Sequence, residues 1–322
     1  MVNLVPVTQL LPDWPLYGFA DDIRPVLGAI LAAGEKAAVA TIVGLEGGGP
    51  RPMGTQMVIG GGQVAGFLSG GCLEGDIAAH AQGVVDSGEP ARLIYGEGSP
   101  WPDIRLLCGS RVEVLLEAVG PGDEAAGRLL ALGEARTPAL WLSDGRRRAC
   151  GPADDPPAPW PGAWARIYRP ATRLIVVGAD PTALAIASLG SQAGLTTTLI
   201  RPRGPVEPPP LSRIAYRREP PAEALAAVGL DPWTAVAVAT HDAHLDHEAL
   251  ICALPSPAFY VGALGARRRA PERAAALAAA GLGEEVIARL ITPIGLDIGG
   301  KAPWEVAVAV IAQITAVAQE AR

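Results

Sequence analysis

The chain has 322 residues, of which 49% are hydrophobic and 18% are charged, and its formal net charge is −7. This length and composition predict a globular protein of two domains with a large core. The negative charge gives no general attraction to phosphate backbones or anionic lipids, so neither nucleic acid nor a membrane is expected as a partner.

The amino terminus and the cysteines indicate the cellular compartment. The opening residues, MVNLVPVTQLLPDWPLYG, have no basic region followed by an unbroken apolar stretch, so no signal peptide is expected. The four cysteines lie far apart and form no CxxC pair: Cys72, Cys108, Cys150 and Cys252. This spacing argues against a zinc knuckle or a disulfide scaffold and predicts a protein of the reducing cytoplasm.

The first half of the chain alternates strand and helix patterns, which predicts an α/β domain. An amphipathic helix is expected over residues 21–33, with Gly34 as its C-cap. The other expected elements are strands at 37–43, 56–59, 63–67, 92–95 and 112–117 and a helix over 76–87. The three glycines at 60–62 separate two of these strands and predict a β-hairpin.

A proline-rich segment, residues 152–170, separates the two halves. Its prolines disfavour a helix or a central strand, so a loop or an interdomain linker is expected. We place the boundary near Arg169, which gives a first domain of residues 1–168, including this linker, and a second domain of residues 169–322.

The second half predicts a Rossmann-like domain. Strands are expected at 173–177, 196–200, 235–239 and 259–261, with a helix over 181–193. Such alternation is typical of a parallel sheet with helices on both faces. The most apolar segment, at 306–318, is interrupted by Gln313 and Thr315 and is too short to span a bilayer, so it predicts a buried C-terminal helix.

Two glycine-rich turns of the first half, residues 47–56 and 69–75, are candidates for binding an anion. Gly70 and Gly71 precede a predicted helix, so their N–H groups can approach an anion with the helix dipole behind them. Cys72 lies at the same turn, where a helix N-terminus favours the thiolate that binds soft metals. The alternative is that the glycines only make tight turns around a small buried cysteine.

The turn after the strand at 173–177 departs from a dinucleotide-binding fingerprint. Its sequence is VGADPTA, and Asp180 stands where the fingerprint needs the glycine that touches the pyrophosphate. The next strand ends in Arg201, instead of the acidic residue that binds a ribose diol. The sequence therefore predicts the fold without secure NAD(P) binding.

Residues 240–247, THDAHLDH, contain three histidines and two aspartates. The spacing of His241, His244 and His247 suits one helical face and invites a metal interpretation. Because the segment directly follows a strand, His241 and Asp242 are expected in a loop at the carboxyl edge of the sheet, where ligands bind. A ligand-facing loop is the first interpretation, a solvated helix cap the second and a metal site the third.

Two later turns combine glycines with cations: YVGALGARR at 260–268 and TPIGLDIGGK at 292–301. Their cations suit an anionic ligand. The alternative is that both are ordinary turns between a strand and a helix, with Lys301 and Pro303 beginning the last helix.

Several of these motifs resemble those of the xanthine dehydrogenase accessory factor family, the XdhC/CoxI type. They are GPRPMGTQM at 49–57, VAGFLSGGCLEG at 64–75, THD at 240–242 together with Asp246, and the two turns just described, the second continuing to Glu305. Cys108 and Gly109, ahead of the strand at 112–117, are a further match. Ser110 and Ala266 depart from the glycine and the serine that are usual in the family. The resemblance spans both domains.

The resemblance implies an accessory protein for molybdenum hydroxylases such as xanthine dehydrogenase. Such a protein binds molybdenum cofactor (molybdopterin), supports its sulfuration and delivers it to the apo-enzyme, and is not itself an enzyme. A cysteine desulfurase and a second copy of the chain are further candidate partners. Cys72 is the candidate molybdenum ligand. The residues expected to bind the cofactor are Arg51, Gln56, Ser69, Gly70, Gly71, Cys72, Glu74, Cys108, Gly178, His241, Asp242, Gly262, Gly265 and Gly295.

Two other functions stay open on the sequence. The first is an NAD(P)-dependent oxidoreductase that uses the Rossmann-like domain, against which Asp180 and Arg201 count. The second is a scaffold that recruits the desulfurase or the apo-enzyme and holds no cofactor.

Overall fold

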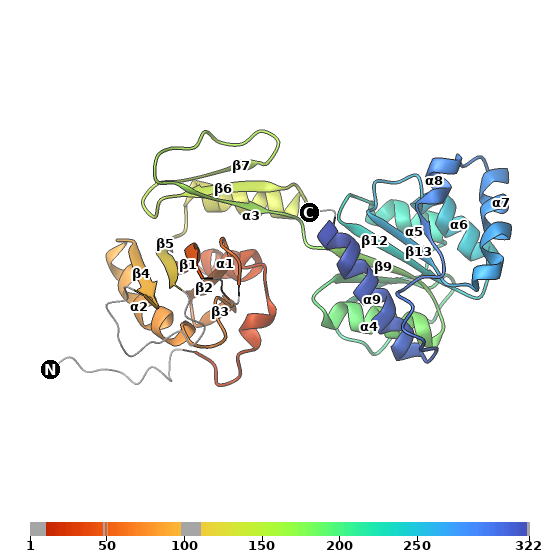
Figure 1. Ribbon diagram of the computed structural model, residues 1–322, viewed down its shortest axis with the longest axis horizontal. Coiled ribbons are helices and arrows are strands. Elements are labelled where there is room, and N and C mark those ends of the chain that lie inside the picture. Colours follow the sequence, from red (N-terminus) through yellow and green to blue (C-terminus); the bar gives the residue numbers. More distant parts are fainter. Residues whose placement is uncertain (1–10, 48, 50, 98–110, 321–322) are drawn as a thin grey trace. The chain divides into compact units, whose positions relative to one another are not determined.

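The computed structural model describes residues 11–47, 49, 51–97 and 111–320. Its internal contacts divide the chain into two compact units, the first ending at Pro170 and the second starting at Ala171 (Figure 1). Each unit has its own sheets and helices. The prediction of an α/β fold with a parallel sheet in the second half is confirmed.

The main sheet of the first unit is antiparallel and has the strand order β3-β2-β1-β5-β4. Its strands are β1 (Ala37–Glu46), β2 (Gln56–Gly60), β3 (Gln63–Gly66), β4 (Ala91–Tyr95) and β5 (Arg111–Val119). The predicted hairpin joins β2 to β3 through Gly61 and Gly62, which have φ angles of 54° and 68°. Two consecutive positive φ angles are the geometry that a two-residue hairpin turn demands, which explains the glycines.

A second, three-stranded antiparallel sheet has the order β7-β6-β8. Its strands are β6 (Ala139–Ser143), β7 (Arg148–Pro152) and β8 (Trp164–Tyr168). The prediction that all of residues 152–170 form a loop or linker is therefore wrong for β8. The last proline before this strand is Pro161, and the following WARIY alternates side chains and supplies the donors of an edge strand. Residues 153–163 form the turns that connect β7 to β8.

Helices cover both faces of the main sheet of this unit. They are α1 (Arg24–Ala32), α2 (Glu74–Ser87) and α3 (Glu124–Glu134). Successive residues of β1 point to opposite faces, so Val39 joins a core with α1, α3 and the small sheet, whereas Ala40 joins a core with α2. The short helix η2 (Leu16–Phe19) precedes α1.

The sheet of the second unit is parallel throughout, in the order β11-β10-β9-β12-β13-β14. Its strands are β9 (Arg173–Gly178), β10 (Thr196–Ile200), β11 (Ile214–Arg217), β12 (Thr234–Ala239), β13 (Tyr260–Ala263) and β14 (Leu290–Ile291). The chain adds β10 and β11 on one side of β9 and then β12 to β14 on the other. The strand order therefore reverses between β9 and β12, which is the switch point where such sheets bind ligands.

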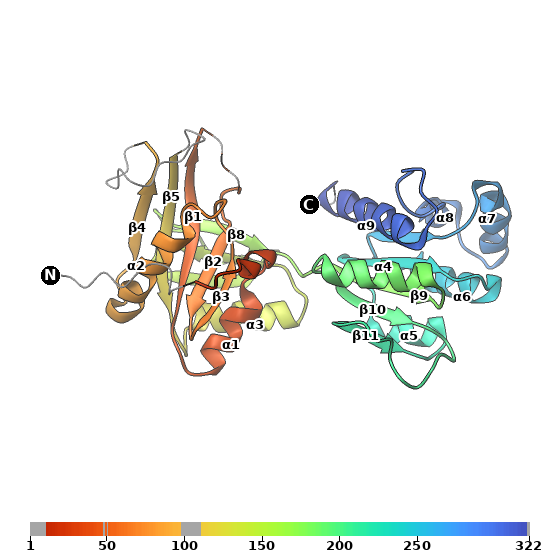
Figure 2. The same cartoon turned by 90° about the horizontal axis from the view of Figure 1, so that it is seen from below.

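The helices of the second unit are α4 (Pro181–Gln192), α5 (Pro221–Val228), α6 (Ala243–Ala253), α7 (Ala270–Ala279), α8 (Glu284–Ala288) and α9 (Pro303–Glu320), with the short η3 (Arg267–Arg269) before α7. The helices α4 and α9 lie side by side and share one core with the sheet (Figure 2). The helices α5, α6 and α7 contribute to the core on the other face. In the described ranges, no helix has both the length and the apolar character needed to cross a bilayer.

Candidate ligand-binding site

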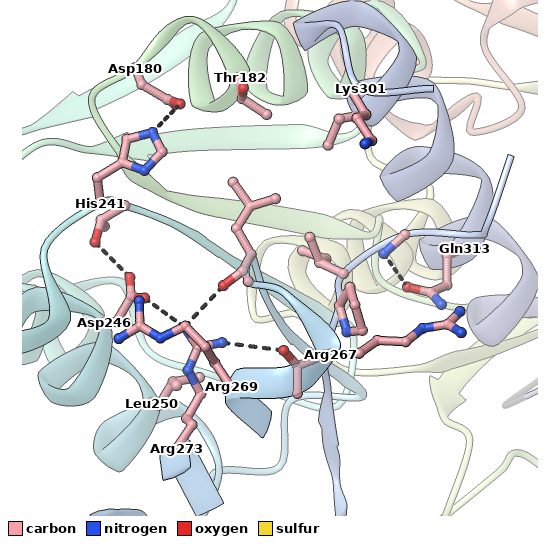
Figure 3. A pocket seen from close by; sticks show the side chains of 18 of the residues that line it. Asp180, Thr182, His241, Asp246, Leu250, Arg267, Arg269, Arg273, Lys301 and Gln313 are labelled. Atoms are coloured by element: carbon pink, nitrogen blue, oxygen red, sulfur yellow. Dashed lines mark hydrogen bonds and ion pairs between the residues drawn. The ribbon is translucent and has the colours of Figure 1, made fainter. Parts of the chain in front are cut away.

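A pocket of about 1060 Å³ lies at the carboxyl edge of the parallel sheet (Figure 3). Its walls come from the segments that follow β9, β12, β13 and β14, and from the helices α6, α7 and α9. Pockets for small molecules and cofactors have volumes of about 300–1,000 Å³, so this one has room for a cofactor-sized ligand. Its position at the switch point follows from the order in which the chain adds strands to the sheet.

Asp180 and His241 meet at the switch point. Asp180 is the N-cap of α4, and its Oδ1 accepts a hydrogen bond of 2.8 Å from the backbone N–H of Ala183. Its Oδ2 lies 3.0 Å from Nε2 of His241, whose side chain is 81% exposed. The Asp180 carboxylate thus occupies the helix N-terminus at which a dinucleotide pyrophosphate binds in Rossmann folds.

A largely buried ion pair between Asp246 and Arg273 lines the pocket. Asp246 Oδ2 accepts 2.9 Å from Arg273 Nη2, and its Oδ1 accepts 2.6 Å from the Thr240 hydroxyl. Arg273 also donates to the carbonyl of Leu264, so this pair ties together the segments that follow β12 and β13. Burial raises the pKa of Asp246, against the effect of Thr240 and Arg273, which favour its charged form. Arg273 lies outside every motif of the sequence, so its role emerges only from the fold.

The remaining cations of the pocket differ in their pairing. Each arginine of the pocket forms an ion pair: Arg267 with Asp297, Arg269 with Glu272, and Arg273 with Asp246. Lys301 lines the same pocket, and no carboxylate of the described part of the chain pairs with its amine. Its backbone N–H and that of Ala302 donate to Glu305, each at 2.9 Å, which holds the turn ahead of α9. Lys301 therefore offers a positive charge to a ligand.

Gln313 contributes the polar group of α9 to the pocket. Its Oε1 accepts hydrogen bonds from the Tyr260 hydroxyl at 2.7 Å and from the N–H of Gly295 at 2.8 Å. The sequence carried one signal for this residue, because a glutamine interrupts an apolar helix. That signal alone does not say which site the side chain serves.

In the first unit, the turn that carries Cys72 is held by the buried carboxylate of Glu74. Glu74 accepts from the N–H groups of Leu68 at 2.9 Å and Ser69 at 2.7 Å, and from the Ser69 hydroxyl at 2.6 Å. The Ser69 hydroxyl in turn accepts from the N–H of Cys72 at 3.0 Å. These donors serve the chain itself, whereas Cys72 is exposed and a Cβ placed on Gly70 or Gly71 would meet nothing within 4 Å. The binding of cofactor by the residues of this turn stays a prediction.

Two other predicted residues of the first unit have partners within the protein. Arg51 forms an ion pair with Asp21. Gln56 is buried, donates to Thr41 Oγ1 at 3.0 Å and accepts from the Tyr168 hydroxyl, so it links the main sheet to β8. Cys108 lies outside the described residues.

The predicted residues of the second unit have three different places in the structure. Gly265 and Gly295 line the pocket together with His241. Gly178 and Gly262 serve packing, since a Cβ on Gly178 would lie 2.3 Å from a backbone oxygen and one on Gly262 would lie 2.7 Å from a side-chain carbon. Asp242 caps α6, which matches the second interpretation of this segment. Within the described ranges, no three His, Cys, Asp or Glu side chains are placed to hold a metal ion.

The fold and the pocket define a two-unit protein whose second unit is a Rossmann-type domain with a polar switch-point pocket. Comparison with models of known protein families identifies the family. The model described as the XdhC Rossmann domain matches residues 174–314, and the model of the XdhC and CoxI family matches residues 30–96. The chain belongs to the XdhC and CoxI family, as its motifs predicted.

Its relatives agree with this assignment. The chain is 30% identical over 303 residues to the molybdenum cofactor insertion chaperone PaoD of Escherichia coli (strain K12), with 92% of this chain and 89% of PaoD covered. It is 31% identical over 153 residues to the uncharacterized protein YqeB of the same organism, with 46% of this chain and 28% of YqeB covered.

A solved structure described as a xanthine dehydrogenase from Bacillus halodurans is similar, with a TM-score of 0.73 and 23% identity, covering 93% of this chain and 96% of that one. At this level of identity the similarity supports the fold alone.

Proposed function

We propose that this chain is an accessory protein that binds molybdenum cofactor as cargo and inserts it into a molybdenum hydroxylase. The relationship to PaoD over most of both chains supports this class of function. The structural observation that carries the proposal is the switch-point pocket. It has the volume of a cofactor site, and its Lys301 amine has no carboxylate partner among the residues that the structure describes.

The chemistry of the pocket suits this cargo. The cofactor carries a phosphate, a polar pterin ring and a soft molybdenum centre. The Lys301 amine is a compact point charge that suits the phosphate. Leu250, Leu264 and Ile294 give the pocket an apolar wall for the flat ring. The three arginines of the pocket each already have a carboxylate within 4 Å, unlike Lys301 among the described residues.

The exposed thiol of Cys72 suits the molybdenum centre, because molybdenum and sulfur are both soft. An exposed ligand also permits exchange, which a carrier needs when it releases its cargo. Cys72 belongs to the first unit and the pocket to the second, so the two parts of the proposal need separate variants. Support of sulfuration and recruitment of a cysteine desulfurase belong to the same proposal.

The test is anaerobic binding of purified molybdenum cofactor, followed by activation of a cofactor-free molybdenum hydroxylase. We expect saturable binding by the wild type, a loss of about tenfold in affinity for Lys301→Gln because one charge-assisted contact is removed, and impaired transfer by Cys72→Ala. Arg268→Gln is the matched control, since Arg268 is exposed and lies outside the pocket. No saturable binding by the wild type, alongside a competent carrier as a positive control, would contradict the proposal.

A further inference from the structure

Gln313 is placed where a helix would otherwise present only apolar side chains to the pocket. It lies in α9, whose buried residues are Ala307, Ala309, Val310, Ile311 and Ile314. In Figure 3 its carboxamide extends into the pocket, next to the segment that follows β14. Its half-buried amide has two different ends, an oxygen that accepts and an NH₂ group that donates hydrogen bonds.

The hydrogen bonds of Gln313 fix the orientation of its amide. A backbone N–H can only donate, so the atom that lies 2.8 Å from the nitrogen of Gly295 is the amide oxygen. The same oxygen accepts from the Tyr260 hydroxyl at 2.7 Å. Both lone pairs of the oxygen are thereby used, and the NH₂ group is left on the side of the pocket. No acceptor in the described part of the chain binds this NH₂ group.

We propose that Gln313 is a specificity-determining residue of the pocket and that its NH₂ group donates to the ring carbonyl of a bound pterin. The choice of a pterin rests on the proposed function, whereas the presence of a donor on the pocket side rests on the two hydrogen bonds that the amide oxygen accepts. An amide recognises an acceptor without adding charge, which distinguishes this contact from the one expected of Lys301.

Tyr260 and Gly295 act as positioning residues for this donor. The Tyr260 side chain is 1% exposed, and burial raises the pKa of its hydroxyl, so the hydroxyl stays protonated and continues to donate. Gly295 is held against α9, since a Cβ at this position would lie 3.1 Å from that of Ala309. A flip would place the NH₂ group against the Gly295 N–H and lose that bond, so the backbone donor fixes which end of the amide faces the pocket.

The decisive variant is Gln313→Glu. A glutamate keeps an oxygen for Tyr260 and Gly295 but replaces the pocket-facing donor with a second acceptor that is negatively charged. If Gln313 had only a structural role, the glutamate would serve nearly as well. Gln319→Glu is the matched control, because it makes the same charge change at an exposed position of the same helix.

The experiment compares two probes by calorimetry: 6-hydroxymethylpterin, which has a ring carbonyl, and its 2,4-diamino analogue, which has an amino donor at that place. We expect the wild type and Gln319→Glu to prefer the carbonyl probe by about tenfold or more, the effect of one lost hydrogen bond and an unpaired donor. Gln313→Glu is expected to reverse this preference, and Tyr260→Phe to reduce it.

The outcomes separate the two proposals. Equal affinity of the wild type for the two probes, or no binding of either at millimolar concentration, overturns the role of Gln313 even when the protein binds molybdenum cofactor. A Gln313-dependent preference in a protein that fails to bind molybdenum cofactor supports this inference and contradicts the proposed function. Because the two probes are compared on the wild type itself, a variant that fails to fold leaves the test valid.

Discussion

Asp180 and His241 come from the turns after β9 and β12, and the 3.0 Å contact between Asp180 Oδ2 and His241 Nε2 bridges the switch point of the sheet. The same carboxylate caps α4. Asp180 stands where the dinucleotide-binding fingerprint has a glycine. Its carboxylate accepts a hydrogen bond at the N-terminus of α4, the place where a ligand phosphate would otherwise bind. Asp180 lines one side of the pocket, which extends from there towards the segments that follow β13 and β14 and towards α9.

The cap gives a first prediction, on stability. Asp180→Ala removes the acceptor for the N–H of Ala183 and is expected to lower the free energy of unfolding of the second unit by about 1 kcal/mol. Asp180→Asn keeps a capping oxygen and should cost only a few tenths of a kcal/mol. Urea unfolding, followed by circular dichroism, measures the difference. Equal losses in the two variants would show that the capping bond is not the cause.

A second prediction concerns dinucleotides. NADH should raise the melting temperature of the wild type very little, because the Asp180 carboxylate occupies the helix N-terminus and repels a pyrophosphate. In Asp180→Gly the N–H groups become available, and the stabilisation by NADH is expected to increase, since a ligand that binds only the native state raises stability. Strong stabilisation of the wild type would instead support the oxidoreductase interpretation.

A third prediction concerns the buried ion pair of the first unit. The Glu117 side chain is fully buried and is bound by Ser143 Oγ at 2.6 Å and Arg148 Nη2 at 3.0 Å. Arg148→Met leaves this carboxylate without its cation and is expected to cost about 3–5 kcal/mol in the free energy of unfolding at neutral pH. Combining Arg148→Met with Glu117→Gln should restore much of the loss, which a double-mutant cycle measures.

The pH dependence of the stability of the Arg148→Met variant follows from the Glu117 carboxyl group. Burial raises the pKa of Glu117 above its unfolded value, and removal of the arginine raises it further. A carboxyl group with a raised folded-state pKa contributes stability that is present below its unfolded pKa and is lost as pH rises through the folded pKa. The variant should therefore be destabilised more at pH 8 than at pH 5. A constant difference between these pH values would be evidence against the buried charge as the cause.

A fourth prediction concerns the thiols. Cys72 is exposed, whereas Cys150 is buried and burial raises its pKa to about 11. At pH 8 only about one Cys150 thiol in a thousand is then ionised, and the thiolate is the reactive form. Iodoacetamide should therefore modify Cys72 in the native protein and reach Cys150 only after unfolding, as peptide mass spectrometry will show. Cys72→Ala is the control for the assignment, and early labelling of Cys150 would contradict the described core.

Local signals predicted much of the fold. The three glycines at 60–62 located the β2–β3 hairpin, and the alternation of strand and helix patterns located β9, α4 and β10. The helix and the three strands between β5 and β9, which are α3, β6, β7 and β8, were not predicted. The helix α3 has an aspartate N-cap but contains Gly127 and Gly133, which weaken its helical pattern. The strand β8 follows a run of prolines, whose local signal for a loop hides the pairing that tertiary structure supplies.

For the site, the sequence by itself determined the family and the segments that reach the switch point, because these depend on short motifs and on the order of strands. Only the tertiary structure decided which side chains meet there. Arg273 contacts Asp246 from another helix, and Gln313 meets Tyr260 across 53 positions of the chain. Such contacts depend on how α7 and α9 pack against the sheet, and no local pattern of residues encodes that packing.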